Sequence, residues 1–342
     1  MHRLSDFDYD LPSSQIAQHP LSDRSASRLF VLDRASGETQ HLHFRDLPTL
    51  IPPRDLLVIN TSRVIPARLR GKRAGGQDAE FLLVRELADG TWLAMAHPGG
   101  KLKPGRRVTV GDDSTVEIVE VLGGGLRRVR FVGALDARGT LEQYGEVPLP
   151  PYIKRAPTTA DVDQYQTVYA VHDGSVAAPT AGLHFTTELL AQIHEQRTFV
   201  TAIDLHVGPG TFKPVETEQL DKHVMHPEAY EISEGAANWV NKVKGAGCRV
   251  WGVGTTVVRA LESAVDERGE VRAGAGETSL FIRPPYDFKV VDHVITNFHL
   301  PRSTLLMLVC AFGGYEHVMN AYREAVKEGY RFYSYGDAML IR

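Results

Sequence analysis

Residues 248–256 read Cys-Arg-Val-Trp-Gly-Val-Gly-Thr-Thr, a short apolar run that ends in a glycine turn. Because the run is rich in β-branched and aromatic side chains, it predicts a strand. Beyond the turn, apolar residues recur on one face of a helix, at Val257, Ala260, Leu261, Ala264 and Val265. A strand that passes through glycine into an amphipathic helix is one half of a βαβ unit.

The same alternation recurs on both sides of this segment. Residues 199–207 and 290–296 predict two further strands, and apolar periodicity after residue 304 and over residues 318–326 predicts two helices. Strands that alternate with helices favour an α/β sandwich with a largely parallel sheet. In such sheets, ligands bind beyond the carboxyl ends of the strands.

Four polar loops fall at predicted strand ends. Residues 178–186, Ala-Pro-Thr-Ala-Gly-Leu-His-Phe-Thr, precede a helix that Thr186 or Thr187 is expected to cap. The other three are Leu-His-Val-Gly-Pro-Gly-Thr-Phe over 205–212, Gly-Val-Gly-Thr-Thr over 252–256 and Thr-Asn-Phe-His-Leu-Pro-Arg-Ser-Thr over 296–304. Any one of them alone would be an ordinary turn, but four in one domain predict a binding site. The candidate ligand-binding residues are Thr180, Gly182, Phe185, Gly208, Gly210, Gly254, Thr255, Thr256, Asn297, Phe298 and Ser303.

Residues 81–132 have a different pattern. Five short β-rich runs, over 81–87, 91–96, 106–110, 115–122 and 126–132, are divided by turns, most of which contain glycine. Strands at such close spacing indicate a small barrel or sandwich. The region closes with the proline-rich joint Val-Pro-Leu-Pro-Pro-Tyr over 147–152, which is a plausible domain boundary.

The formal charge of the chain is −4, but basic residues gather near this segment. Residues 61–130 contain 13 Lys or Arg against 8 Asp or Glu, a net charge of +5. Local positive potential attracts phosphates whatever the overall charge, although a solvated arginine-rich face is an equal alternative. The candidate nucleic-acid contacts are Arg63, Arg68, Arg70, Lys72 and Arg73.

The composition is that of a soluble globular protein: 342 residues, 43% hydrophobic and 23% charged. No apolar run approaches the roughly 18 residues that cross a bilayer, and the N-terminus lacks the apolar centre of a secretory signal. The two cysteines, Cys248 and Cys310, lie far apart in apolar segments. We therefore expect a cytoplasmic protein with no membrane partner, no disulfide and no metal site.

Several segments occur in an order that resembles a known family. They are Asn-Thr-Ser-Arg-Val-Ile-Pro-Ala-Arg-Leu over 60–69, the 178–186 loop, the 206–212 turn, His-Val-Met-His-Pro-Glu over 223–228, Val-Gly-Thr-Thr over 253–256, the 297–304 loop and Tyr-Ser-Tyr-Gly-Asp-Ala-Met over 333–339. The pattern spans nearly the whole chain and resembles the S-adenosylmethionine:tRNA ribosyltransferase-isomerase family of queuosine biosynthesis. Pro227 and Ala229 depart from it, where a serine and an aromatic residue are expected.

The resemblance implies a Rossmann-like α/β sandwich, residues 1–61 and 151–342, with an inserted small basic β-barrel, residues 62–150. It also implies the reaction. The ribosyl part of S-adenosylmethionine is transferred to the 7-aminomethyl-7-deazaguanine at the tRNA wobble position and isomerised, giving epoxyqueuosine-tRNA, adenine and methionine. S-adenosylmethionine is then a substrate and tRNA the partner, with no separate cofactor or metal. We expect a monomer.

Such a reaction needs a positioned base, because a sulfonium acidifies the neighbouring C5′ hydrogens, and a group that hydrogen-bonds the departing adenine. His184 and His206 are favoured, because each lies beside a glycine-bearing turn, and His226, His299 and Asp204 are further candidates. We expect Phe185 or Phe298 to stack on adenine or on the modified base. The helix N-terminus at residues 254–256 would receive the methionine carboxylate or a tRNA phosphate.

Two other functions fit parts of the sequence. A nicotinamide-dependent oxidoreductase would use the same α/β scaffold, but residues 252–256 lack the G-x-G-x-x-G dinucleotide pattern. A non-catalytic RNA-binding protein would explain the basic segment but not four polar loops at strand ends.

Overall fold

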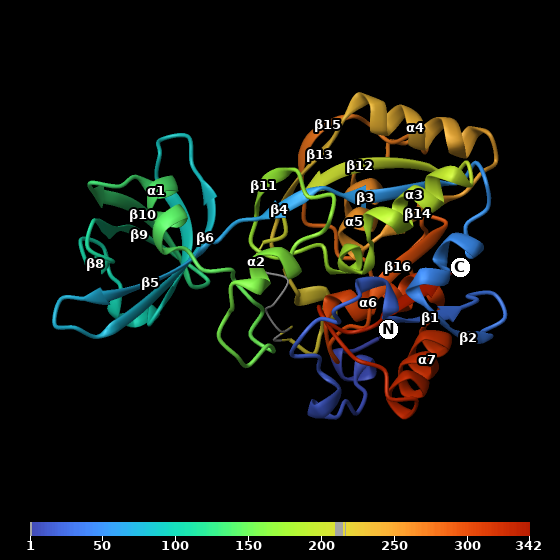
Figure 1. Ribbon diagram of the computed structural model, residues 1–342, viewed down its shortest axis with the longest axis horizontal. Coiled ribbons are helices and arrows are strands. Elements are labelled where there is room, and N and C mark those ends of the chain that lie inside the picture. Colours follow the sequence, from blue (N-terminus) through green and yellow to red (C-terminus); the bar gives the residue numbers. More distant parts are fainter. Residues whose placement is uncertain (1, 209–214, 216) are drawn as a thin grey trace.

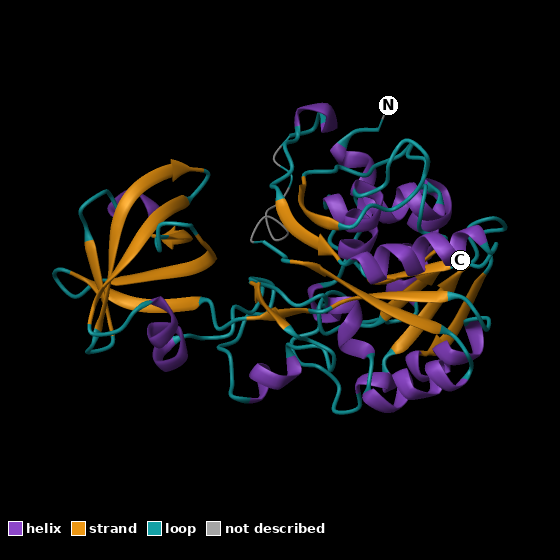
Figure 2. Cartoon of the chain, turned by 90° about the horizontal axis from the view of Figure 1, so that it is seen from above, coloured by secondary structure: helices purple, strands orange, loops and turns teal. Residues whose placement is uncertain are grey.

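The chain folds into two bodies along one long axis (Figures 1 and 2). The computed structural model describes residues 2–208, 215 and 217–342. A nine-stranded sheet with its helices lies at one end of the axis, and a closed six-stranded barrel lies at the other. The mixed α/β class predicted from the sequence is confirmed.

The large sheet mixes parallel and antiparallel strand pairs. Its strands are β1 (Arg28–Leu32), β2 (Thr39–His43), β3 (Leu56–Asn60), β12 (Phe199–Leu205), β13 (Glu228–Ile232), β14 (Val250–Val253), β15 (Gly274–Thr278), β16 (His293–Asn297) and β17 (Ala338–Ile341). They lie in the order β15-β13-β12-β3-β14-β16-β17-β1-β2. Strands β12, β3, β14 and β16 are mutually parallel, but β17 runs antiparallel to β16, and β2, β13 and β15 also pair antiparallel. The expectation of a largely parallel sheet therefore holds for the four central strands, whose carboxyl ends share one edge, and for the separate parallel pair of β1 with β17.

Helices cover both faces of this sheet. They are α3 (Thr187–Glu195), α4 (Glu234–Gly245), α5 (Thr255–Ser263), α6 (Thr304–Gly313) and α7 (Tyr315–Lys327). Alternate residues of a strand point to opposite faces, so Leu56 and Val58 of β3 join the core under α4 to α7, whereas Leu57 and Ile59 join the core under α3. Thr186 caps α3 by accepting a hydrogen bond from the backbone N–H of Leu189 at 3.1 Å, as the sequence predicts.

The barrel has a hydrophobic core of its own. Its strands are β5 (Arg68–Arg73), β6 (Asp78–Glu86), β7 (Trp92–His97), β8 (Arg107–Val110), β9 (Ser114–Gly123) and β10 (Leu126–Gly133), in the closed order β10-β7-β6-β5-β8-β9. Strand β5 is additional to the five strand runs expected. After β10, helix α1 (Ala137–Tyr144) packs on the barrel through Ala137 and Leu141.

Two segments join the bodies. The chain leaves the sheet through β4 (Ser62–Val64), which pairs in parallel with β11 (His172–Ser175), and it returns through residues 147–165, which include α2 (Ala160–Gln164). At the base of the barrel, Arg68 and Glu146 exchange two backbone hydrogen bonds, of 3.1 and 2.8 Å. Within the described residues, every helix is too short or too polar to cross a membrane.

Candidate active site

A cavity of about 350 Å³ lies at the carboxyl ends of β14 and β16. Three of the four polar loops line it, through residues 178–181, 254–256, 296–300 and 303, and we call it the loop cavity. The predicted ligand-binding residues on its wall are Thr180, Gly254, Thr255, Thr256, Asn297, Phe298 and Ser303. The structure thus brings together seven of the eleven ligand-binding candidates, at the sheet edge where ligands of α/β proteins bind.

The first turn of α5 forms one wall of the loop cavity. Gly254 precedes the helix with a φ of +94°, a backbone conformation that residues with a side chain rarely adopt. The first helical hydrogen bond is donated by the N–H of Val258, so the helix supplies no acceptor for the N–H groups of Thr255 and Thr256. The Oγ1 atom of Thr256 is buried and has no hydrogen-bond partner in the described part of the chain. This wall therefore suits an anionic or acceptor group.

Asn297, at the end of β16, lines the same cavity and has a buried acceptor without a partner among the described residues. Its side chain is buried, and its Nδ2 atom bonds the carbonyl oxygen of Tyr333 at 3.0 Å and the Nε2 of His184 at 3.1 Å. Both amide hydrogens are therefore used, and Oδ1 is left buried with no partner among the described residues. Because a buried polar atom is nearly always hydrogen-bonded, this oxygen indicates a place for a ligand donor.

His184 lies behind Asn297 rather than on the wall of the loop cavity. Its Nδ1 bonds the hydroxyl of Ser27 at 2.7 Å, and its ring packs on Phe44 with centroids 5.0 Å apart. Burial, together with the charges of Arg331 and Arg24, lowers the pKa of His184 to about 3, so the ring is neutral at pH 7. With both nitrogens engaged, His184 is placed to orient Asn297 and not to exchange a proton with a ligand in the cavity.

Tyr333 and Tyr152 form an aromatic wall that the sequence did not assign to the site. The two rings stack with centroids 4.5 Å apart and an interplanar angle of 24°. Tyr333 has a φ of +71°, which is strained for a residue with a side chain, and its hydroxyl is buried without a partner within the described chain. Backbone strain of this kind clusters at functional sites, where surrounding contacts hold it in place.

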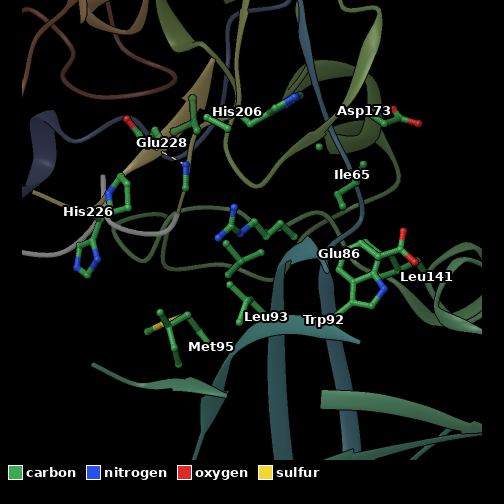
Figure 3. Close-up of a pocket in the computed structure, with 18 of the residues that line it drawn as sticks. Ile65, Glu86, Trp92, Leu93, Met95, Leu141, Asp173, His206, His226 and Glu228 are labelled. Atoms are coloured by element: carbon green, nitrogen blue, oxygen red, sulfur yellow. Dashed lines mark hydrogen bonds between the residues drawn. The ribbon is translucent and has the colours of Figure 1, made fainter. Parts of the chain in front are cut away.

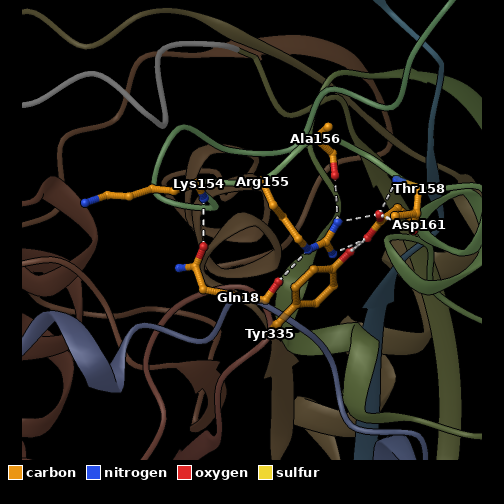
Figure 4. Close-up of polar contacts among 7 residues, drawn as sticks. All are labelled: Gln18, Lys154, Arg155, Ala156, Thr158, Asp161 and Tyr335. Atoms are coloured by element: carbon orange, nitrogen blue, oxygen red, sulfur yellow. Dashed lines mark hydrogen bonds and ion pairs between the residues drawn. The ribbon is translucent and has the colours of Figure 1, made fainter.

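A buried polar network fixes the returning segment that carries Tyr152 (Figure 4). The carboxylate of Asp161 accepts two hydrogen bonds from Arg155, each 2.7 Å, two from the backbone and hydroxyl of Thr158, and one from the hydroxyl of Tyr335 at 2.8 Å. Burial by itself would raise the pKa of Asp161, but these hydrogen bonds outweigh it and hold the pKa well below its usual value. Tyr335 follows Tyr333 closely in sequence, so the network ties both halves of the aromatic wall together.

His299 also lines the loop cavity. Its Nε2 bonds the hydroxyl of Thr296 at 2.8 Å, and its backbone N–H donates to the hydroxyl of Tyr322 at 3.1 Å. Burial lowers the pKa of His299 to about 3, so it is neutral at pH 7.

A second, larger cavity of about 700 Å³ lies between the barrel and the sheet (Figure 3), and we call it the barrel cavity. His206, Gly208 and His226 line it, not the loop cavity, while Val207 lines both. The Nδ1 atom of His206 is buried and has no hydrogen-bond partner in the described residues. Burial is the main cause that lowers the pKa of His206, against an opposing effect of Asp204.

Asp204 lines neither cavity. Its carboxylate contacts Nδ1 of the exposed His172 at 2.8 Å and accepts a hydrogen bond from the hydroxyl of Thr61 at 2.9 Å. These contacts join β12 to β11 and to the start of β4. The structure therefore places Asp204 in the connection between the two bodies.

The remaining ligand-binding candidates have other places. The ring of Phe185 packs on Phe44 inside the core under α3, and Phe298 lies fully buried among Phe30, Tyr322 and other rings, so neither ring offers a free face for stacking. Gly182 allows close packing, because a Cβ there would lie 2.1 Å from the hydroxyl of Tyr169. Gly210 lies outside the described residues.

All five predicted nucleic-acid contacts have protein partners. Arg63 lies 3.7 Å from Asp173, Arg68 3.3 Å from Glu80, Arg70 3.1 Å from Glu146 and Lys72 2.5 Å from Asp78, and Arg73 donates to a backbone carbonyl. Of the four that form ion pairs, Arg63, Arg70 and Lys72 are about half exposed or more, whereas most of the Arg68 side chain is covered. Their positive charge is therefore partly neutralised at the barrel surface.

Comparisons with known proteins agree along the whole chain. The family model described as "Queuosine biosynthesis protein" matches residues 4–341. A protein of Moorella thermoacetica named S-adenosylmethionine:tRNA ribosyltransferase-isomerase is 50% identical, with 99% of each chain covered. The protein of the same name from Thermus thermophilus is 53% identical, with 100% of each chain covered. A crystal structure of S-adenosylmethionine tRNA ribosyltransferase from Thermotoga maritima has 37% identity and a TM-score of 0.57, and the match covers 99% of this chain and 100% of that one. This chain therefore belongs to the queuosine biosynthesis protein family.

Proposed function

We propose that this chain is an enzyme with the activity for which its relatives are named, S-adenosylmethionine:tRNA ribosyltransferase-isomerase. It would transfer and isomerise the ribosyl moiety of S-adenosylmethionine onto 7-aminomethyl-7-deazaguanine at the tRNA wobble position, releasing adenine and methionine. The observation that carries the proposal is the loop cavity, on whose wall Thr256 Oγ1, Asn297 Oδ1 and the Tyr333 hydroxyl are buried without partners in the described chain. Three such atoms in one cavity support a polar ligand.

We assign S-adenosylmethionine to the loop cavity. The N–H groups of Thr255 and Thr256 suit its carboxylate, and Asn297 Oδ1 suits a donor, which its ammonium or adenine amino group supplies. The stacked rings of Tyr152 and Tyr333 offer an aromatic wall in place of Phe185 and Phe298. S-adenosylmethionine is here a substrate, and the proposal includes no separate cofactor and no metal.

Proton transfer is proposed for His206. Its Nδ1 has no partner in the described structure, and the next residue, Val207, lies on the walls of both cavities. His184 and His299 become positioning residues, because each is neutral and its hydrogen bonds hold the 296–299 loop. His226 stays a reserve candidate on the barrel cavity, and Asp204 acts at a distance through its charge on His206.

The proposal extends to the architecture and setting of the enzyme. Residues 1–61 and 151–342 form a Rossmann-like α/β catalytic domain, and residues 62–150 form a small β-barrel inserted into it. The separate cores of the two bodies support this division. We propose a monomer that works in the cytoplasm on tRNA.

The activity is tested by incubating the protein with S-adenosylmethionine and tRNA that carries the precursor base. We expect free adenine and free methionine in equal amounts, and neither when the tRNA carries guanine at the wobble position. A non-catalytic RNA-binding protein would release neither product, and an oxidoreductase would release neither but would change the absorbance of a nicotinamide that is added in a parallel reaction. Either of these results would reject the proposal.

Binding of tRNA by the basic strand β5 is tested by its dependence on salt. Changing Arg70, Lys72 and Arg73 together to Gln should lower the slope of log K against log salt by roughly 0.7 to 0.9 for each phosphate that the protein no longer neutralises. The control is Lys242→Gln with Arg268→Gln, which removes two exposed cations outside the barrel. If the β5 variant keeps the wild-type slope, as the control should, the β5 cations contact only their protein partners and no tRNA phosphate.

A further inference from the structure

The barrel cavity has an apolar wall in an unusual place. Along β7, Trp92 and Ala94 belong to the barrel core, so the alternate residues Leu93 and Met95 point outward. Outward positions of a small barrel are normally polar, yet these two face the barrel cavity (Figure 3). Leu126 of β10 lines the same cavity. Trp92 also lines the cavity, and its Nε1 is buried without a partner among the described residues.

The charged residues around this wall divide into paired and unpaired groups. Glu228 is bound by the buried Arg259, and its other oxygen accepts the N–H of Gly208 at 3.1 Å. Glu277 pairs with Arg85 at 3.1 Å, and Asp173 with Arg63 at 3.7 Å. In contrast, Glu86 on β6 and Glu142 on α1 form no ion pair or side-chain hydrogen bond within the described chain. Glu86 lies opposite Trp92 in the strand register, which places a free carboxylate beside the indole.

One cation on the wall is also free. Arg138, one helical turn before Glu142 on α1, lines the cavity and has no ion pair in the described residues. The cavity therefore combines an apolar and aromatic wall, two unneutralised carboxylates and one guanidinium. These features complement, in turn, a planar ring, a primary ammonium and a phosphate.

We propose that the barrel cavity receives a single RNA nucleotide turned out of its stack, with a base that carries a primary ammonium. The base lies against Leu93, Met95 and Trp92, its ammonium is bound by Glu86 and Glu142, and Arg138 contacts the phosphate. A volume of about 700 Å³ is within the range of pockets that enclose small ligands. Enzymes that act on a base inside folded nucleic acid commonly extrude it into such a pocket.

This inference rests on the proposed function, because it takes the aminomethyl base as the occupant. Val207, shared by the walls of both cavities, then lies where an amine in the barrel cavity and a ribosyl group in the loop cavity meet. The two carboxylates would distinguish the aminomethyl base from guanine, which has no such cation.

The test compares the affinities of two tRNAs, one with the aminomethyl base and one with guanine at the wobble position, without S-adenosylmethionine. We expect the wild-type protein to prefer the aminomethyl tRNA by about tenfold or more, as a charge-assisted hydrogen bond allows. The double variant Glu86→Gln with Glu142→Gln should lose this preference while its affinity for the guanine tRNA stays within about twofold. The matched control, Glu267→Gln with Glu270→Gln, removes two acids from a distant turn and should keep the preference.

Arg138→Gln gives an independent readout. The substitution should weaken the binding of both tRNAs equally. It should also lower the slope of log K against log salt by roughly 0.7, the value for one phosphate contact on a single strand. The inference is overturned if the wild-type protein binds both tRNAs equally, or if the Glu86/Glu142 variant keeps its preference. Release of adenine and methionine is measured separately, so a chain that catalyses the reaction but fails these binding tests refutes the nucleotide site alone. A chain that releases neither product refutes the proposed function itself.

Discussion

Replacing Asn297 with alanine should slow the release of adenine by roughly 10- to 100-fold. The substitution removes the unpartnered Oδ1 from the wall of the loop cavity, and a hydrogen bond to a charged ligand group contributes about 1.5–3 kcal/mol. It also leaves His184 Nε2 and the Tyr333 carbonyl without their shared donor. The measurement is kcat/KM for S-adenosylmethionine, determined from adenine release at saturating tRNA.

The matched control for this prediction is Asn241→Ala. Asn241 lies on α4 and exchanges two hydrogen bonds with the backbone of Val271, of 3.0 and 2.9 Å, away from both cavities. It should lower stability and leave kcat/KM unchanged. A folded Asn297→Ala protein with a near-normal rate would remove Asn297 from the substrate site.

Replacing Asp161 with asparagine should lower the free energy of unfolding by about 3–5 kcal/mol. Asp161 is fully buried, and the substitution leaves Arg155 without the charge that neutralises it. Urea unfolding at pH 7 measures the difference. Asp163→Asn, an exposed change in the same short helix, should alter the free energy of unfolding by less than about 0.5 kcal/mol.

The pH dependence of this difference has a defined sign. The pKa of Asp161 is lowered in the folded state, so its stabilisation is present above the unfolded-state pKa of about 3.9 and is lost as pH falls toward the folded value. The gap between wild type and Asp161→Asn should stay constant from pH 7 to about pH 5 and narrow below pH 4. A gap that narrows already between pH 7 and pH 5 would show that another group titrates there.

Local signals in the sequence predicted much of this fold. The glycine turn before α5 and the threonine cap of α3 need only a few neighbouring residues, and both are present. Two of the polar loops meet because the parallel strands β14 and β16 that carry them end at one edge, and the 178–181 segment, which follows β11 of the small two-stranded sheet, joins them there. The antiparallel β17 carries no comparable local signal, because its direction depends on which strand it joins.

The parts of the site that were missed depend on contacts between distant segments. The stacking of Tyr152 on Tyr333 joins residues that are far apart in the sequence, and nothing near either residue indicates this contact. His184 has the residue type of a proton-transfer group, but only its contacts with Ser27 and Asn297 show that both nitrogens are engaged. The sequence did not predict the barrel cavity, because Leu93 and Met95 belong to an ordinary strand pattern. Only the position of the barrel beside the sheet shows that their side chains line a cavity.

The two backbone hydrogen bonds between Arg68 and Glu146 have a consequence for how the chain tolerates change in length. These hydrogen bonds hold the two ends of the barrel segment next to each other. The chain therefore enters and leaves the barrel at one point, as it enters and leaves a hairpin. The free-energy cost of closing a loop grows only with the logarithm of its length, by about 0.6 kcal/mol for each doubling. Here the loop is the segment between the bridged residues Arg68 and Glu146. The turns of the barrel can therefore gain or lose residues without loosening the sheet edge on which the loop cavity is built.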